Sequence, residues 1–279
     1  MKTPSATTPA LLSVAVAIGA WFGLIAVAQV LPEGGSLARV VHLLGGSSQG
    51  FIQAAIYGVA TYSYLLLRRR QLSLKRESAA FSQALLPEQD QLVLTPEEVA
   101  GIKLEAIRRE QTGQRSIVGD LIKKACTQFR NANNVGETLQ VFQAQVATRK
   151  EATEGELEIV RYLTGAIVSL GFIGTLLGLS SSIGLSHLAK TEEGMGEVTS
   201  ALNLAFDTTL VALVVGLLLN FMYHRYLRDV DTFYSRTRAY VIDNLISRIY
   251  RPRELESLRH GPAVAKRQAR NTTVALDLT

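Results

Sequence analysis

Hydroxyl and carboxylate groups inside two apolar stretches are the side chains of this sequence best suited to chemistry. The first stretch holds Thr175 among glycines and serines, and the second holds Asp207, Thr208 and Thr209. A hydroxyl oxygen in a membrane span can pass a proton or bind a dehydrated cation. A charged residue there is a functional candidate, because placing it in the bilayer costs about 2.5–3.5 kcal/mol. The residue types therefore indicate either an ion path or polar groups that join neighbouring helices.

Small residues lie on one face of the first stretch, with the spacing i, i+3, i+4, i+7 and i+11. They are Gly171, Gly174, Thr175, Gly178 and Ser182. A second small or polar face follows at Thr209, Ala212, Gly216 and Asn220. Because small residues let helices approach closely in lipid, we expect the glycines and Ser182 to pack one helix against the other.

The sequence shows no catalytic or ligand-binding arrangement. Four histidines lie at span edges or in the tail (His42, His187, His224, His260), and Cys126 is the single cysteine, so neither a zinc site nor a redox pair can form within one chain. No glycine-rich phosphate loop with a following Lys-Ser or Lys-Thr is present. We expect no enzyme activity, no metal and no cofactor.

The apolar stretches are long enough to cross a membrane. The chain has 279 residues, of which 47% are hydrophobic and only 19% charged. A span needs about 20 apolar residues, and four windows qualify: residues 11–31, 51–67, 162–185 and 204–223. The second window is short, and the uncharged residues 40–50 can extend its helix. We therefore predict an all-α integral membrane protein with four transmembrane helices, two of which continue as long helices into a helical cytoplasmic region.

Basic residues set the orientation of these spans, since Lys and Arg resist translocation. They cluster after the second span (Arg68, Arg69, Arg70, Lys75, Arg76) and after the fourth (Arg225, Arg228, Arg236, Arg238), whereas each of the other two loops has one, Arg39 or Lys190. This predicts cytoplasmic termini, and it explains the net charge of +5 without nucleic acid. The first span also resembles a signal peptide cleaved near Ala28, but its apolar run is longer than such signals have, which favours a retained helix.

The pattern divides the chain into five parts. Residues 1–70 hold two N-terminal spans, 71–161 a helical cytoplasmic insert, 162–226 the paired spans, 227–250 a cytoplasmic helix extension, and 251–279 a basic tail expected to be disordered. In the insert, Thr95, Pro96 and Glu98 predict a helix start with a capping box. Asp207 lies only three residues from the outer end of its window, so solvation at the interface or capping by Thr208 is the alternative to an ion-path role.

The residues of the paired spans resemble a known family. Gly171-Phe172-Ile173-Gly174-Thr175-Leu176-Leu177-Gly178-Leu179, a polar loop, and Ala205-Phe206-Asp207-Thr208-Thr209-Leu210-Val211-Ala212-Leu213 are similar to the inner spans of the MotA/TolQ/ExbB proton channel family. The resemblance covers about residues 160–226. It implies a homopentamer in a bacterial inner membrane, around a dimer of a single-span MotB/ExbD/TolR-like partner whose membrane Asp takes up and releases the ion. Ion-motive force then drives mechanical work.

The resemblance also suggests roles for single residues. Thr175 matches the family's pore-lining hydroxyl, and the second family threonine corresponds to Thr208 or Thr209. ExbB and TolQ members usually carry a Glu five positions before that threonine, where this sequence has Asn203 if the count starts at Thr208. Asn cannot titrate, and no motif assigns that role to Asp207, although its carboxylate is a candidate substitute.

Two questions stay open at this stage. The span count resembles the flagellar stator MotA while the Gly-Thr core resembles ExbB and TolQ, and hydroxyl ligands serve H⁺ and Na⁺ alike. The main alternative function is a tetraspan scaffold whose small faces only pack helices and whose basic flanks hold anionic lipid. A solute transporter ranks last, because the sequence shows neither inverted halves nor a broken helix.

Overall fold

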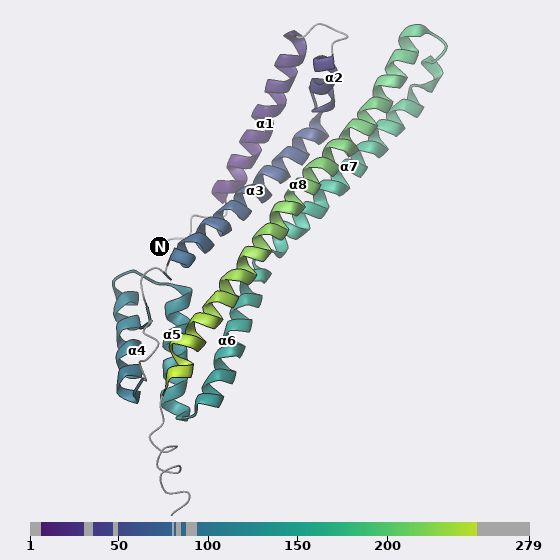
Figure 1. The fold of residues 1–279 in the computed structure, drawn as a ribbon. Helices are drawn as coiled ribbons and strands as arrows, with labels where there is room; N and C mark the ends of the chain where they lie inside the picture. Colours follow the sequence, from purple (N-terminus) through teal and green to yellow (C-terminus); the bar gives the residue numbers. More distant parts are fainter. Residues whose placement is uncertain are drawn as a thin grey trace, which may run out of the picture. The chain divides into compact units, whose positions relative to one another are not determined.

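The computed structural model describes residues 7–30, 36–46, 50–79, 81, 85–87 and 94–249, and within these the chain is helical throughout, with no named strand (Figure 1). The α-helices are α1 (Thr7–Val30), α2 (Ser36–Leu43), α3 (Phe51–Ser78), α4 (Pro96–Gln111), α5 (Ile117–Ala132), α6 (Val135–Gly155), α7 (Glu158–Gly184) and α8 (Glu192–Asn244). Short 3₁₀ turns follow at Ser186–Leu188 and Ile246–Arg248. The predicted all-helical class is confirmed, and the predicted tail at residues 251–279 lies outside the described residues.

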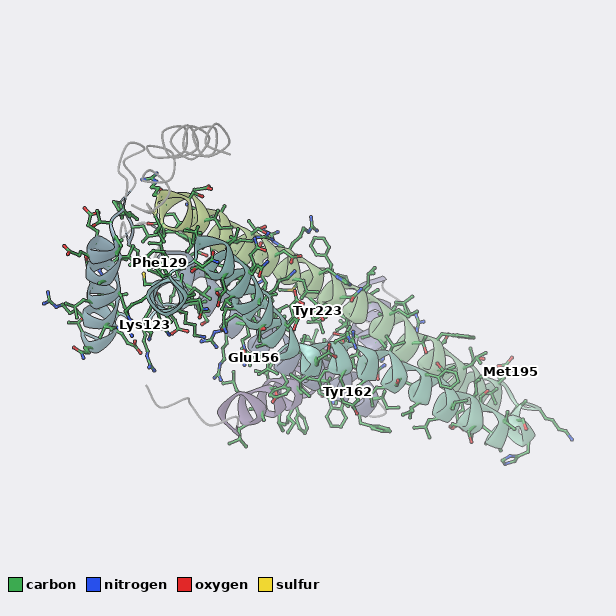
Figure 2. All side chains as sticks on the ribbon, turned by 90° about the horizontal axis from the view of Figure 1, so that it is seen from below. Lys123, Phe129, Glu156, Tyr162, Met195 and Tyr223 are labelled. Atoms are coloured by element: carbon green, nitrogen blue, oxygen red, sulfur yellow. The ribbon has the colours of Figure 1, made fainter. Side chains whose placement is uncertain are left out.

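Three helical stretches of the described chain have the length and composition to cross a membrane: Ala10–Val30, Val135–Gly184 and Glu192–Arg248. They cover the first and third predicted windows except for the last residue of each, and they contain the whole fourth window. Large apolar side chains project from them, and Tyr162 and Met195 on α7 and α8 are 70% and 50% exposed (Figure 2). Such surfaces suit lipid or neighbouring chains, and the chain is a membrane protein.

The segment before the second window departs from the prediction. Residues 40–50 do not extend the helix of that window, because α2 ends at Leu43 and α3 begins at Phe51. Gly45 has φ +102°, a conformation that side chains disfavour, and a side chain at Gly50 would overlap the Gly45 carbonyl. The Tyr57 hydroxyl donates to the Leu44 carbonyl at 2.9 Å and satisfies a group freed at the end of α2. The expectation that residues 40–50 can extend the helix of the second window was therefore wrong.

The chain forms two compact units, which are described separately. The first comprises residues 1–75 and 150–232, and the second comprises residues 76–149 and 233–279. In the first unit, α3, α7 and α8 pack around an apolar cluster of Ile52, Ile56, Ile167, Val211, Ala212 and Leu219. α1 approaches α3 where Ala17 meets Gly58, at which an added Cβ would lie 3.3 Å from the Ala17 methyl group.

The second unit is built from capped amphipathic helices. At the start of α4, the Thr95 hydroxyl accepts from the Glu98 amide while Glu98 accepts from the Thr95 amide at 2.7 Å, which confirms the predicted capping box. α5 buries one face, including Leu121 and Phe129, and ends at Asn133 in the left-handed conformation with φ 47°. The local sequence thus explains where α4 begins and where α5 ends.

Candidate functional site

Small residues bring α7 and α8 of the first unit into close contact. An added Cβ at Gly178 would lie 2.6 Å from the Ala205 methyl group, and one at Gly174 would overlap the Thr208 side chain. Gly171 faces Ala212 in the same way. The remaining predicted packing residues also face the neighbouring helix: Ser182 donates to the Val198 carbonyl at 3.3 Å, and an added Cβ at Gly216 would lie 3.3 Å from Val168. These residues leave no room for larger side chains between the two backbones.

Two hydroxyl groups meet within this interface. The Oγ1 atoms of Thr175 on α7 and Thr209 on α8 are in direct hydrogen-bond contact. Thr209 also donates to the Gly171 carbonyl at 3.0 Å, and Thr175 Oγ1 lies 3.2 Å from the Ala205 carbonyl and 3.3 Å from that of Gly171. Both threonines are partly exposed. We call these two hydroxyls and two carbonyls the threonine cluster, and its oxygen atoms could bind a proton carrier or a small cation.

Thr208 has a different environment. Its side chain is fully buried against Gly174, and its hydroxyl donates to the Ala205 carbonyl one turn earlier at 2.9 Å. The resemblance left open whether Thr208 or Thr209 corresponds to the second family threonine, and only one of them contacts Thr175. In the structure Thr209 does so, and Thr208 fills the helix interface instead.

The packing register places Asp207 deeper than its window suggested. Ala205 lies opposite Gly178 and Thr209 opposite Thr175, so Asp207 lies at about the level of residue 177. That level is roughly 12 Å along the helix axis from Leu185, the end of the charge-free window of α7. The Asp207 side chain is 8% exposed, and the Thr208 hydroxyl bonds elsewhere. In the structure the Asp207 carboxylate is therefore neither exposed to solvent nor capped by the Thr208 hydroxyl.

Asp207 has an ionic partner that sequence reasoning missed. Arg39 Nη2 on α2 lies 2.8 Å from Asp207 Oδ1, and the two residues are 168 positions apart. The available signal was weak: Arg39 was the single basic residue between the first two windows, and Asp207 was the single charge in the fourth. An acidic residue in an apolar span favours a partner of opposite charge, and Arg39 is the one Lys or Arg between the first two windows.

Other candidate residues stay outside the threonine cluster. Asn203 and Asn220 are exposed on α8, and Cys126 is buried in α5. His187 Nδ1 contacts the Gly184 carbonyl at 2.9 Å at the end of α7. Among the residues that the structure describes, no group of three or more His, Cys, Asp or Glu side chains is arranged to hold a metal ion.

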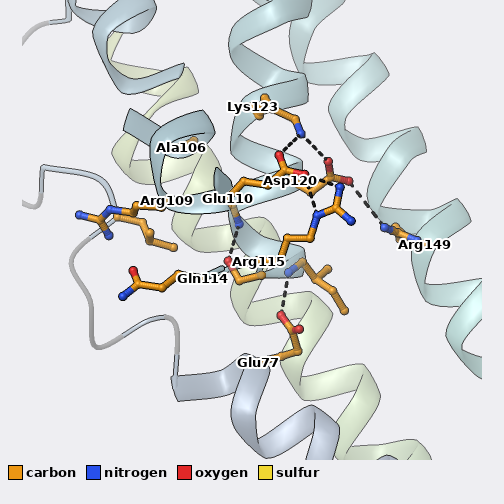
Figure 3. Close-up of a pocket in the computed structure, with 13 residues that line it drawn as sticks. Glu77, Ala106, Arg109, Glu110, Gln114, Arg115, Asp120, Lys123 and Arg149 are labelled. Atoms are coloured by element: carbon orange, nitrogen blue, oxygen red, sulfur yellow. Dashed lines mark hydrogen bonds and ion pairs between the residues drawn. The ribbon is translucent and has the colours of Figure 1, made fainter. Parts of the chain in front are cut away.

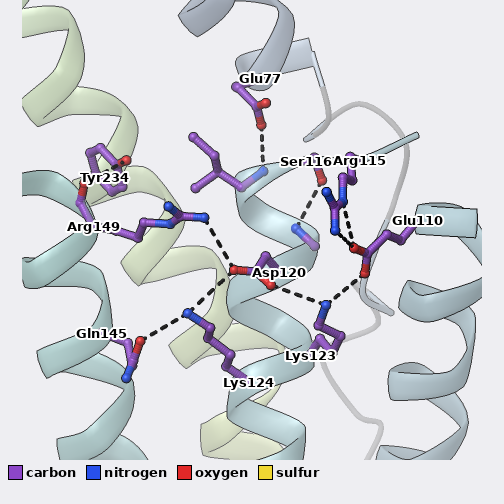
Figure 4. Close-up of polar contacts among 12 residues, drawn as sticks. Glu77, Glu110, Arg115, Ser116, Asp120, Lys123, Lys124, Gln145, Arg149 and Tyr234 are labelled. Carbon is purple, nitrogen blue, oxygen red and sulfur yellow. Dashed lines mark hydrogen bonds and ion pairs between the residues drawn. The ribbon is translucent and has the colours of Figure 1, made fainter. Parts of the chain in front are cut away.

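A charged cavity of about 330 Å³ lies in the second unit, where α4, α5 and α6 meet (Figure 3). Lys123 Nζ lies 2.8 Å from Glu110 and 3.3 Å from Asp120, and Arg149 lies 3.6 Å from Asp120 (Figure 4). Hydrogen bonds to Lys123 and Arg115 lower the pKa of Glu110. Each of these charged groups has an ionic partner, so this network joins three helices.

At the start of α5, Glu77 accepts from the Ile117 amide at 2.6 Å (Figures 3 and 4). Burial raises the pKa of this carboxyl, against the opposing effects of the Ile117 amide and the Arg149 charge. The carboxylate satisfies a backbone donor that the first turn of a helix leaves without an internal partner.

Residues 113–239 match the sequence model of the MotA/TolQ/ExbB proton channel family. The match confirms the resemblance seen in the sequence. It includes the whole threonine cluster and Asp207, and it extends beyond the two spans into α5, α6 and the later part of α8. Comparison with individual curated proteins gives no match.

Proposed function

We propose that this chain is the ion-conducting subunit of a motor that converts ion-motive force into mechanical work, because residues 113–239 match the sequence model of the MotA/TolQ/ExbB proton channel family. The observation that carries the proposal is the threonine cluster, in which Thr175 and Thr209 meet across α7 and α8. The proposed ion path contains Thr175, Thr208 and Thr209, with Asp207 beside them. Thr175 and Thr209 line the path, and Thr208 supports it from within the interface.

The chemistry of the cluster suits transfer to a titrating group on another chain. Hydroxyl and carbonyl oxygens can relay a proton or ligate a cation, but they do not store a charge near neutral pH. The carboxylate that takes up and releases the ion is therefore supplied by a single-span MotB/ExbD/TolR-like partner, present as a dimer within a homopentamer of this chain. One proton that crosses 100 mV releases about 2.3 kcal/mol, which is the energy available for work. The carried ion is H⁺ or Na⁺, and no cofactor takes part.

The proposed topology has four spans in a bacterial inner membrane with both termini in the cytoplasm. α2 and α3 together form the second span, in which the first helix ends at Leu43 and the second begins at Phe51. A break at membrane depth needs protein around it, since unpaired backbone groups are costly in lipid. The bond from Tyr57 to the Leu44 carbonyl supports this arrangement. Residues 1–70 and 162–226 are then the membrane parts, 71–161 and 227–250 the cytoplasmic helices, and 251–279 a cytoplasmic tail.

The test is reconstitution of the full chain in proteoliposomes, alone and with the single-span protein encoded beside it. Proton entry is followed with an internal pH-sensitive dye, Na⁺ entry with a Na⁺-sensitive dye, and copy number by native mass spectrometry. We expect a homopentamer that gains two partner chains and conducts only with them. A monomer or dimer that ignores the partner and gives no ion flux would contradict the proposal and favour the scaffold.

A further inference from the structure

We propose that Arg39 is a positioning residue, whose ion pair with Asp207 fixes α2 to α8 beside the threonine cluster. In this assignment Asp207 serves as the counter-ion of Arg39 and does not carry protons. The inference rests on the proposed function and goes beyond it, because it assigns different tasks to the hydroxyls and to the carboxylate of the ion path.

The burial of the two side chains is unequal. Asp207 is 8% exposed, whereas Arg39 is 52% exposed and lies 2.8 Å from the buried carboxylate oxygen. A buried carboxylate without a partner is strongly destabilising, more so than the same site with both charges removed. If Asp207 took up a proton, its carboxyl group would become neutral, and Arg39 would lose its counter-ion in each cycle.

α2 is attached to the helices that surround the threonine cluster at its middle and at its C-terminal end. Arg39 reaches α8, while Leu43 packs on the apolar cluster and the Leu44 carbonyl accepts from Tyr57 of α3. The short helix α2 therefore bridges α3 and α8. Loss of the ion pair between Arg39 and Asp207 would remove the charged contact that holds α2 to α8.

The ion pair of Arg39 and Asp207 lies next to the threonines along α8. Asp207 directly precedes Thr208, which is enclosed against Gly174, and lies two residues before Thr209. A rotation of α8 at Asp207 would move the Thr209 hydroxyl away from Thr175. The pair thus influences the ion path by fixing the rotation of α8.

The test is a double-mutant cycle on the full chain with its partner, in which the melting temperature in detergent and ion flux in proteoliposomes are both measured. The variants are Arg39→Gln, Asp207→Asn and the doubly neutral Arg39→Gln/Asp207→Asn. Each single variant should lower the melting temperature by several degrees, since it leaves one charge unpaired. The double variant should recover most of the melting temperature and most of the flux, because no charge is left unpaired.

The control is Arg161→Gln, which removes an exposed arginine that pairs with Glu158 on the same helix, and it should change neither quantity. Recovery of the melting temperature without flux in the double variant would make Asp207 a proton carrier and overturn the inference. Single variants that melt like the control would also overturn it. If the wild-type chain conducts no ions, the proposed function fails, and the melting temperatures still decide whether the pair fixes α2 to α8.

Discussion

The hydroxyl groups of Thr175 and Thr209 meet across the interface of α7 and α8, and each also lies within hydrogen-bonding distance of the Gly171 carbonyl. Such close contact requires the two backbones to approach, which Gly171, Gly174 and Gly178 allow. The glycines that permit packing and the hydroxyls proposed to conduct are therefore parts of one interface, and substitutions can separate the two roles.

The two neighbouring threonines of α8 should respond differently to replacement by valine, which keeps the shape and removes the hydroxyl. Thr209→Val should abolish partner-dependent flux, because it removes a hydroxyl of the threonine cluster. Thr208→Val should retain most of the flux, because its hydroxyl only bonds the Ala205 carbonyl inside the interface. Flux in proteoliposomes checks both variants, and equal loss of flux would contradict the distinction.

Gly178→Ala should destabilise the contact between α7 and α8, since the new methyl group would lie 2.6 Å from that of Ala205. Overpacking of this kind costs about 1–3 kcal/mol. Gly165→Ala is the matched control on the same helix, because an added Cβ there meets nothing within 4 Å. Thermal unfolding in detergent should separate the two variants, and similar melting temperatures would argue against the close approach of the helices.

The sequence predicted the helical class, the capping box of Thr95 and Glu98, and the small-residue faces of α7 and α8, because each depends on local spacing. It missed the break between α2 and α3, because the absence of charge in residues 40–50 was weighed above the turn signal of Gly45 and Gly46. It also missed the burial of Asp207, because the fourth apolar window begins only three residues before Asp207 although α8 begins at Glu192. The pair of Arg39 and Asp207 depends on tertiary contact across 168 residues, which spacing along one helix cannot reveal.

Glu77 should make stability fall as pH rises. Burial raises the pKa of its carboxyl above the ordinary value of 4.5, so the folded chain holds this proton more tightly than the unfolded chain does. The contribution of Glu77 to the stability of the fold is complete below the pKa that its carboxyl has in the unfolded chain. It is lost as pH rises through the pKa that the carboxyl has in the folded chain. The melting temperature of wild type relative to Glu77→Gln should therefore decrease between about pH 4 and about pH 7.

The control for this measurement is Glu105→Gln, which makes the same change at a side chain that is 61% exposed on α4. The difference in melting temperature between Glu105→Gln and wild type should vary less with pH over the same interval. A wild-type advantage over Glu77→Gln that grows with pH would have the wrong sign and would contradict the assignment.

Cys126 should resist thiol reagents while the chain is folded. Burial raises its pKa to about 12, and the thiolate is the reactive form. Labelling by a maleimide near neutral pH, followed by mass spectrometry, should be slow until the chain is unfolded. Leu104→Cys in a Cys126→Ser background provides an exposed comparison, since Leu104 is 52% exposed. Equal labelling rates at the two positions would show that α5 does not protect Cys126.

Ion flux through Thr175 variants tests the central claim most directly. The full chain with its partner is reconstituted as wild type, Thr175→Val and Thr175→Ser, and assembly is checked in each sample by native mass spectrometry. Conduction through the threonine cluster predicts that all three assemble alike, that Thr175→Val stops the flux, and that Thr175→Ser retains it because the hydroxyl is kept. Undiminished flux through an assembled Thr175→Val complex would contradict the claim, and the hydroxyl of Thr175 would then serve packing alone.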